Sequence, residues 1–195
     1  MLASGGSSEE DQRNYFRIIQ SNSDLLLRLI NDILDLSRLE ANKVILTPED
    51  CDVVQLCRQA LSSVEMSRRE SGNRFVFETK TDSFVLQTDI QRLQQVLINL
   101  LTNAAKFTKN GTITLQFEVE KEKNRVLFAV ADTGCGIPKE KQKQVFERFE
   151  KLNEYAQGTG LGLSICKLTV DKWGGDIWID PDYEGGARFV VSHPL

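Results

Sequence analysis

The chain has 195 residues, of which 41% are hydrophobic and 27% are charged, and its formal net charge is −4. This size suits one globular domain with an appendage, or two small domains. Acidic and basic residues are interspersed without a basic tract, which argues against nucleic acid as a partner. The sequence shows neither a signal peptide nor an apolar run long enough to cross a bilayer. We therefore expect a cytoplasmic protein, or the cytoplasmic portion of a membrane-bound one, with no membrane contact of its own.

The first 41 residues predict a loop followed by one long helix. Residues 1–8 are polar and rich in Gly and Ser, as in a loop. In residues 9–41 the apolar residues recur at spacings of three and four, like the seam of a coiled coil. The residues of this seam are Leu26, Leu29, Ile33 and Leu36. A helix this apolar needs a partner, and no other segment predicts one. We expect either a homodimer through helix 9–41 or a partner segment outside this sequence.

Residues 42–195 alternate between predicted helices and strands, after a break at Pro48. The predicted helices span residues 53–71, 90–107, 138–149 and 161–173. The predicted strands span residues 74–80, 83–89, 111–120, 125–132, 175–180 and 187–192. This order predicts an α+β two-layer sandwich, in which one mixed β-sheet carries about three helices on one face.

The four cysteines and the single histidine do not predict a metal site or a disulfide framework. None of the cysteines forms a CxxC pair, and His193 is the only histidine, so a zinc site lacks ligands. We expect the cysteines to be reduced and mostly structural. Cys135 is the exception, because it lies between two glycines in a predicted loop.

Helix 90–107 carries a narrow polar face opposite its leucines. The residues of this face are Arg92, Gln95, Asn99, Asn103 and Lys106. Asparagine is a poor helix former, and Lys or Glu would serve a plain solvent-exposed face better. The face is therefore either an ordinary surface or a set of oxygen donors and one cation that can hold Mg²⁺ and a polyphosphate.

Two glycine-containing motifs follow this helix. "DTGCGIP" begins with Asp132 at the end of an apolar strand, where a carboxylate can accept a hydrogen bond from an exocyclic amine such as adenine N6. Gly134 and Gly136 allow a tight turn and the close approach of a flat ring. "GTGLGL", residues 158–163, directly precedes a helix, and glycine amides at a helix N-terminus bind anions. It is neither a Walker A loop nor a dinucleotide fingerprint.

Taken in this order, the motifs resemble the ATPase domain shared by sensor histidine kinases, gyrase, Hsp90 and MutL. "NLLTNAAKFT" resembles the N box, "DTGCGIP" the G1 box, "VFERF" the F box and "GTGLGL" the G2 box. The resemblance covers residues 42–195 and implies a Bergerat-type fold that holds ATP between helices under a lid, roughly residues 149–159. Phe146 and Phe149 are the F-box aromatic residues, although packing alone explains most of their presence.

The resemblance also implies roles for single residues and two cofactors, ATP and Mg²⁺. Asp132 corresponds to the aspartate that reads adenine N6, Asn103 to the Mg²⁺ ligand and Lys106 to the phosphate-facing lysine. Lys151 stands where many members of the family carry a basic residue near the γ-phosphate. The implied catalytic residues are Asn99, Asn103, Lys106 and Lys151. The implied ATP-binding residues are Asn103, Lys106, Phe107, Asp132, Gly134, Gly136, Ile137, Phe146, Phe149, Gly158, Thr159, Gly160, Leu161, Gly162 and Leu163.

One N-box position favours a kinase over an ATPase. In gyrase, Hsp90 and MutL, the residue one turn before the Mg²⁺ asparagine is a glutamate that activates water, whereas this chain has Asn99. An amide cannot serve as that general base. The resemblance therefore implies phosphoryl transfer by positioning and charge neutralisation. An ATP-hydrolysing clamp or switch ATPase, and a non-catalytic nucleotide-binding dimerisation module, are the alternatives.

Helix 9–41 is similar to the second helix of the kinase dimerisation and histidine-phosphotransfer hairpin, and residues 1–8 to the hairpin loop. The acceptor motif of that family, a histidine followed by an acidic residue and Arg-Thr-Pro, does not occur here. We therefore expect a fragment of a sensor histidine kinase that binds Mg-ATP but does not phosphorylate itself. Its expected partners are an acceptor helix of its own or a neighbouring subunit, and the receiver domain of a response regulator.

Overall fold

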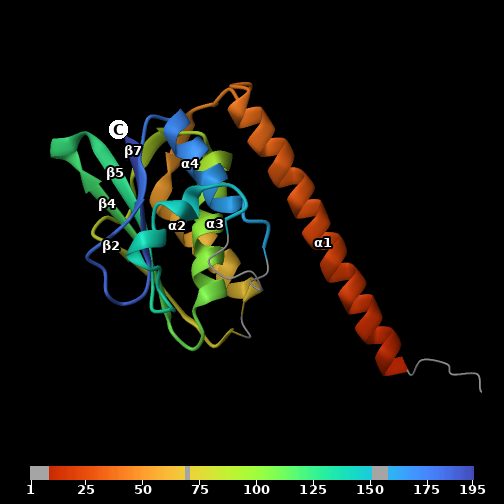
Figure 1. Ribbon diagram of the computed structural model, residues 1–195. Helices are drawn as coiled ribbons and strands as arrows, with labels where there is room; N and C mark the ends of the chain where they lie inside the picture. The colour runs from red at the N-terminus through yellow and green to blue at the C-terminus, as the bar shows by residue number, and fades with distance from the viewer. Residues whose placement is uncertain (1–8, 69–70, 151–157) are drawn as a thin grey trace, which may run out of the picture.

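The computed structural model describes residues 9–68, 71–150 and 158–195. One long helix, α1 (Glu9–Glu40), leads into an α/β domain, as the sequence predicts. Figure 1 shows that the C-terminal end of α1 adjoins the domain and that the helix points away from the domain towards its N-terminus. Most apolar side chains of α1 as far as Leu34 are therefore exposed. Within the described residues, no helix has the length and apolar character needed to cross a membrane.

The centre of the domain is a five-stranded mixed sheet with the strand order β2-β4-β5-β7-β6. Its strands are β2 (Arg74–Thr79), β4 (Thr112–Glu120), β5 (Arg125–Asp132), β6 (Ile177–Ile179) and β7 (Arg188–Pro194). β2 is parallel to β4, and the other neighbours are antiparallel. The predicted hairpin at the C-terminal end is present as the β6–β7 pair. β5 lies in the middle of the sheet, so its last residue, Asp132, reaches the edge from which a site can be built.

A second, two-stranded sheet joins β1 (Glu49–Asp52) to β3 (Val85–Thr88). The predicted strand 83–89 therefore does not enter the main sheet. Cys51 and Leu86 face each other in this small antiparallel pair, and both are buried. This pairing brings the segment before α2 next to the start of α3, so it fixes the relative positions of these two helices.

Three helices cover one face of the main sheet, as predicted (Figure 1). They are α2 (Val53–Ser67), α3 (Ile90–Phe107) and α4 (Gly162–Lys172). Asp89 caps α3, since its Oδ1 accepts the N–H of Arg92 at 3.1 Å. Asp52 caps α2 in the same manner. Such caps stabilise a helix by about 1 kcal/mol. α2 ends at Ser67, earlier than its predicted end at residue 71.

The prediction of a helix over residues 138–149 is wrong. The structure has two short 3₁₀ turns there, Lys139–Lys141 and Gln144–Phe146. In these turns only Val145 is buried, so the segment has no apolar stripe to pack on the domain. Helices of this length depend on such packing, because their intrinsic propensity alone is insufficient. The segment therefore follows the edge of the domain as an irregular connection.

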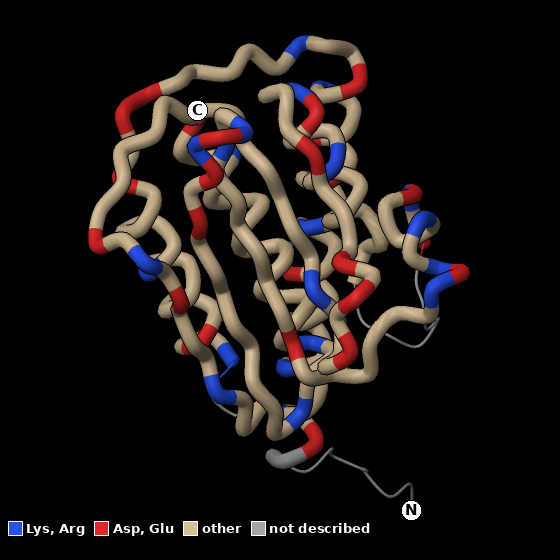
Figure 2. Tube along the Cα trace, turned by 90° about the vertical axis from the view of Figure 1, so that its left-hand side faces the viewer, with Lys and Arg blue, Asp and Glu red and all other residues tan. Residues whose placement is uncertain are grey.

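The main core lies between the inner face of the sheet and the helices. Leucines of α3 and inward residues of β4 and β5 are fully buried there, among them Leu93, Leu97, Leu100, Leu101, Ile113, Leu115 and Phe128. A second, smaller cluster joins α1 to α4 through Leu36, Leu39, Leu161 and Ile165. Figure 2 shows charged residues of both signs scattered over the tube, with tan stretches along the central strands. The second cluster packs the C-terminal end of α1 against the domain.

Candidate nucleotide site

A cavity of about 720 Å³ opens between α3, the loop after β5, the glycine loop before α4, and α1. Its volume is in the range of sites that hold ligands of cofactor size. The main core clusters around α3 and β5 fix two of its walls, because these elements are packed on each other. The other two walls are the glycine loop and α1, which contact each other through Thr159 and Asp32.

Asp132 lines this cavity with a buried carboxylate. Its side chain is only 4% exposed, at the end of β5. Oδ1 accepts the N–H of Gly134 at 2.9 Å and the N–H of Ala187 at 3.3 Å. Burial raises the pKa of Asp132 above its ordinary value, although these two hydrogen bonds oppose the effect. The backbone thus holds the carboxylate in one orientation, as a fixed acceptor facing the cavity.

Glycines surround Asp132 because the backbone passes close to it from two directions. Gly136 has a φ of 69°, a conformation that other residues rarely adopt. A Cβ on Gly134 would collide with the carbonyl oxygen of Phe107, at the end of α3. A Cβ on Gly186 would collide with the backbone of Asp132 itself. The glycine spacing of this motif therefore serves close packing around the carboxylate as well as access for a ligand.

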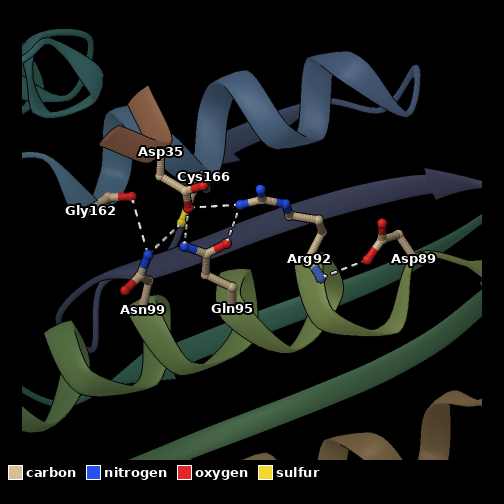
Figure 3. Close-up of polar contacts among 7 residues, drawn as sticks. All are labelled: Asp35, Asp89, Arg92, Gln95, Asn99, Gly162 and Cys166. Carbon is tan, nitrogen blue, oxygen red and sulfur yellow. Dashed lines mark hydrogen bonds and ion pairs between the residues drawn. The ribbon is translucent and has the colours of Figure 1, made fainter. Parts of the chain in front are cut away.

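The polar face of α3 divides into two parts with different surroundings. Asn99, Asn103 and Lys106 line the cavity. Arg92 and Gln95 instead contact Asp35 of α1, as Figure 3 shows. Asn99 lies between the two parts, and its amide nitrogen is 3.5 Å from the carbonyl oxygen of Gly162. The face is therefore not a plain solvent surface: one half adjoins the cavity and the other binds a helix.

The glycine loop before α4 passes over the cavity end of α3. A Cβ on Gly158 would lie 3.2 Å from Nζ of Lys106, and a Cβ on Gly162 would lie 3.7 Å from the amide carbon of Asn99. α4 has no side-chain cap at its start, so its first N–H groups are available to an anion. The ammonium group of Lys106 and the start of α4 thus lie on either side of one glycine loop.

The F-box segment is joined to this loop by its backbone. The N–H of Phe149 donates to the carbonyl of Gly160 at 3.0 Å. Both residues have a positive φ, 60° for Phe149 and 73° for Gly160. Lys151, predicted to approach the γ-phosphate, lies outside the described residues. The hydrogen bond brings the two ends of the predicted lid together beside the cavity.

Most of the predicted site residues share this cavity. Those that line it are Asn99, Asn103, Lys106, Phe107, Asp132, Gly136, Ile137, Gly158, Thr159, Gly160, Gly162 and Leu163. Gly134, Phe146, Phe149 and Leu161 do not line it. Phe146 packs edge-to-face on Phe189 with ring centroids 6.2 Å apart, so packing explains its presence. Phe149 is 62% exposed, so packing does not explain the presence of an aromatic residue there. Leu161 is buried in the α1–α4 cluster.

The sequence motifs did not predict the wall that α1 contributes. Ser21, Asn22, Leu25, Arg28 and Asp32 line the cavity from that helix. Oδ2 of Asp32 accepts the hydroxyl of Thr159, in the glycine loop, at 2.8 Å. The sequence pattern that could have indicated this wall is a pair of carboxylates three residues apart, Asp32 and Asp35, inside the apolar run of the helix. Carboxylates at that spacing lie on one face, and this face needs polar partners.

Asp35 fixes α1 against α3. It accepts hydrogen bonds from Arg92 at 2.7 Å and from the side-chain amide of Gln95 at 2.8 Å (Figure 3). Burial alone would raise the pKa of Asp35, but these two hydrogen bonds and the charges of Arg92 and Arg38 together outweigh burial and hold the pKa below its ordinary value. Glu40 pairs with Arg148 further along the helix. α1 is therefore held at the cavity by polar contacts as well as by the leucine cluster.

The residues present suit Mg²⁺ only in company with a ligand that supplies oxygens. Among the described residues, no group of three or more His, Cys, Asp or Glu side chains is placed to hold a metal ion. Asn103 provides one amide oxygen in the cavity. Mg²⁺ keeps several waters and is commonly held by one or two protein oxygens plus substrate phosphates. This donor set therefore fits Mg²⁺ that arrives with a polyphosphate.

Comparison with known proteins identifies two family models in the chain. The model described as "Histidine kinase-, DNA gyrase B-, and HSP90-like ATPase" matches residues 88–195, and the model of the "His Kinase A (phospho-acceptor) domain" matches residues 1–42. The chain is 38% identical, over 97% of its length, to the circadian input-output histidine kinase CikA of Synechococcus elongatus. It is 35% identical, over 94% of its length, to hybrid signal transduction histidine kinase D of Dictyostelium discoideum. It spans 26% of the first relative and 12% of the second.

Solved structures resemble the whole arrangement of helix and domain. Full-length ShkA in complex with AMPPNP superposes with a TM-score of 0.82 at 31% identity, over 94% of this chain and 39% of ShkA. The histidine kinase ThkA in complex with the response regulator protein TrrA superposes with a TM-score of 0.78 at 28% identity, over 98% of this chain and 53% of ThkA.

Proposed function

Since this chain belongs to the histidine kinase-, DNA gyrase B- and HSP90-like ATPase family, we propose that it is the ATP-binding catalytic part of a sensor protein-histidine kinase. In this proposal residues 42–195 bind Mg-ATP, residues 9–41 belong to the dimerisation and phosphotransfer domain, and residues 1–8 to its hairpin loop. The observation that carries the proposal is the shared cavity. It brings the buried carboxylate of Asp132, the amide of Asn103 and the ammonium of Lys106 around one space.

Each end of the cavity suits one part of ATP. Asp132 is oriented by two backbone N–H groups and accepts hydrogen bonds, so it suits the exocyclic amine of adenine. Lys106 and the glycine loop supply positive charge and N–H groups for the phosphates. Asn103 is the proposed Mg²⁺ ligand, and Mg²⁺ neutralises phosphate charge as the γ-phosphoryl group leaves ADP. The chain's own contribution is to bind, orient and screen the nucleotide.

Asn99 supports phosphoryl transfer over hydrolysis. An amide does not accept a proton from water, so this position of α3 lacks a general base. Its nitrogen instead lies 3.5 Å from the carbonyl oxygen of Gly162 and 3.7 Å from the sulfur of Cys166. We therefore propose that Asn99 positions the start of α4 relative to α3 and activates no water. This argues against the alternative of an ATP-hydrolysing clamp.

We propose that the phosphoryl group passes to a histidine outside these 195 residues, on a dimerisation helix of the same or a second subunit. His193 is unsuited to be the acceptor, because it is 5% exposed and its ring lies 4.9 Å from that of Trp173. In the transfer, an imidazole nitrogen bonds to the γ-phosphorus while the bond to the bridging oxygen of ADP breaks. A response-regulator receiver domain is the proposed next partner, and the complex of ThkA with TrrA supports this class of partner.

The exposed apolar side of α1 supports a homodimer. Tyr15, Phe16, Ile18 and Ile19 are each more than half exposed, and so are Leu26 and Leu27. Such an apolar helix surface is stable in water only when another helix covers it. We propose that a second copy of the dimerisation domain covers it.

Calorimetric titration with Mg-ADP tests the nucleotide site directly. The parent chain is expected to bind saturably, and Asn103→Ala and Asp132→Asn are expected to bind at least about tenfold more weakly, as loss of a charged or metal-coordinating contact predicts. Asp82→Asn, at an exposed loop position, is the matched control and should bind like the parent. Absence of binding by the parent chain would overturn the proposed function.

A second assay tests the acceptor. Radiolabelled ATP should leave no stable phosphate on the parent chain alone. Addition of a dimerisation domain that carries the acceptor histidine should yield acid-labile label on that domain. Stable label on the parent chain would contradict the proposed position of the acceptor, and steady ATP turnover without transfer would support the clamp ATPase instead.

A further inference from the structure

The cavity is completed by a helix that the nucleotide-binding motifs do not include. α1 supplies one wall, and its position there is set by the Asp35–Arg92 pair at 2.7 Å and by the leucine cluster with α4. Asp32 lies one turn from Asp35 on the same face and lines the cavity. A carboxylate of α1 is therefore part of the lining of the proposed polyphosphate site.

Asp32 contacts the glycine loop at its centre. Its Oδ2 accepts the hydroxyl of Thr159 at 2.8 Å, and the same hydroxyl oxygen lies 3.3 Å from the N–H of Leu161. Thr159 stands between Gly158, which adjoins the ammonium of Lys106, and Gly160. The loop is thus tied to α1 by its one hydroxyl side chain. A phosphate bound by the loop amides would share this space with the carboxylate.

We propose that Asp32 determines the choice between nucleoside di- and triphosphate, by placing a negative charge of α1 on the loop that would receive the terminal phosphate. The inference rests on the proposed function of the cavity and adds a specificity residue from outside the nucleotide-binding motifs. While α1 is docked, the site accepts a diphosphate more readily than a triphosphate. A triphosphate binds fully only when Asp32 leaves Thr159.

The charges around Asp32 support this assignment. Arg28, one turn earlier on α1, lines the same cavity and lowers the pKa of Asp32, whereas Asp35 raises it. Burial is the largest influence, and the pKa of Asp32 lies above its ordinary value as a result. The hydrogen bond from Thr159 and the charge of Arg28 oppose this rise only in part. Because Asp32 contacts Thr159 of the glycine loop, a terminal phosphate on that loop would lie near this carboxylate, and the two negative charges would repel each other.

The coupling works in both directions. If docking of α1 disfavours a terminal phosphate, then a bound triphosphate must disfavour docking of α1 by the same factor. Loading of ATP would then release α1 from the glycine loop, and α1 is the helix that joins this domain to the proposed dimerisation domain. The contact between Asp32 and Thr159 would thereby couple the choice of nucleotide to the movement of α1 that phosphoryl transfer needs.

The test compares two nucleotides across three variants of α1. Calorimetry measures Mg-ADP and Mg-AMPPNP binding to the parent chain, Asp32→Asn, Arg28→Gln and Asp24→Asn. Asn can still accept the Thr159 hydroxyl, so Asp32→Asn removes the charge and keeps the contact. We expect it to tighten Mg-AMPPNP binding by about fivefold or more, the lower range of coupling between sites, and to change Mg-ADP binding by less than about twofold.

The other two variants distinguish an effect of charge at the cavity from a general effect of charge changes on α1. Arg28→Gln should act in the opposite direction and weaken Mg-AMPPNP more than Mg-ADP. Asp24→Asn, exposed on the same helix and outside the cavity lining, should change neither. An unchanged ratio of the two affinities in Asp32→Asn would overturn the inference alone. So would weaker Mg-AMPPNP binding, which would make Asp32 an attractive ligand. A parent chain that binds neither nucleotide would overturn the proposed function as well.

Discussion

Asp35 of α1 and Arg92 of α3 form an ion pair at 2.7 Å across 57 positions of the sequence. Both side chains are 19% exposed, and Gln95 shares the same carboxylate oxygen. The pair joins the long helix to the helix that carries the N box.

The Asp35–Arg92 pair is expected to hold α1 in its docked position. A double-mutant cycle of Asp35→Asn and Arg92→Gln should give a coupling energy of about 1 kcal/mol, because a half-buried charged hydrogen bond exceeds a typical surface pair. Hydrogen exchange of the amides in residues 29–40 measures the docking of α1 in the parent, the two single variants and the double variant. Lys167 and Asp171, an exposed pair within α4, give a control cycle with little coupling. Additive effects at Asp35 and Arg92 would contradict the prediction.

Docking of α1 should weaken in acid. The pKa of Asp35 lies below its ordinary value of 3.8 in the docked state, so the pair contributes fully above that value. Its contribution is lost as the pH falls through the lower, docked-state pKa. Exchange protection of residues 29–40 should fall in that acidic range, and Asp35→Asn should remove this pH-dependent part. A pH profile identical in parent and variant would contradict the assignment to Asp35.

Asp132→Asn should weaken adenine recognition while the fold is kept. The oxygen of Asn can still accept the N–H groups of Gly134 and Ala187, but its amide nitrogen is a donor. Guanine presents an acceptor where adenine presents its amine, so the variant should discriminate less between Mg-ADP and Mg-GDP. Calorimetry with both nucleotides measures the ratio. Burial raises the pKa of Asp132, so the ionised form costs folding free energy at neutral pH, and the variant should unfold no more easily than the parent.

Gly160→Ala should disturb the glycine loop beyond its backbone strain. Gly160 has a φ of 73°, and a Cβ there would lie 2.9 Å from Cα of Phe149. Gly174 has a similar φ of 80° but open space around it. Each variant should lose about 1 kcal/mol of unfolding free energy from the positive φ. Only Gly160→Ala should also weaken Mg-ADP binding, and equal effects of the two variants on binding would contradict the role of the loop contact.

Cys135 should be the one reactive thiol of the native protein. Cys51, Cys57 and Cys166 are buried, and burial raises the pKa of Cys57 and of Cys166 to about 12. Cys135 is exposed and lines the cavity. A thiol reagent should therefore label one equivalent, and Mg-ADP should slow the labelling. Cys135→Ser is the control and should take up none. Labelling at an unchanged rate with saturating Mg-ADP would place the nucleotide away from Cys135.

Local patterns in the sequence were sufficient for the elements and motifs with a strong periodicity. The heptad-like spacing of leucines predicted α1, and the alternation around Ile113 and Leu115 predicted β4. Asp132 was predicted at the end of a buried strand, and the structure places it there, where it lines the cavity. These features depend on neighbours within a few residues, so the sequence displays them directly.

The same reasoning failed where a segment lacks a strong pattern of its own. Residues 138–149 begin with a proline suited to a helix start, yet they form two 3₁₀ turns because they bury little. The strand 83–89 was predicted correctly as a strand, but its partner, β1, was visible only in the fold. Propensity indicates what a segment can become, and packing against distant segments selects among those states.

By itself the sequence determined the family of the domain, the order of its nucleotide-binding motifs and the absence of a glutamate at Asn99. Only the tertiary structure decided that α1 forms a wall of the cavity and that Asp32 meets Thr159, 127 positions away. Contacts between residues this far apart produce no periodic pattern in the sequence, because each of the two polar residues would be equally compatible with its neighbours if it were exposed to solvent. The energy of such a pair exists only after the main core has brought the two elements together.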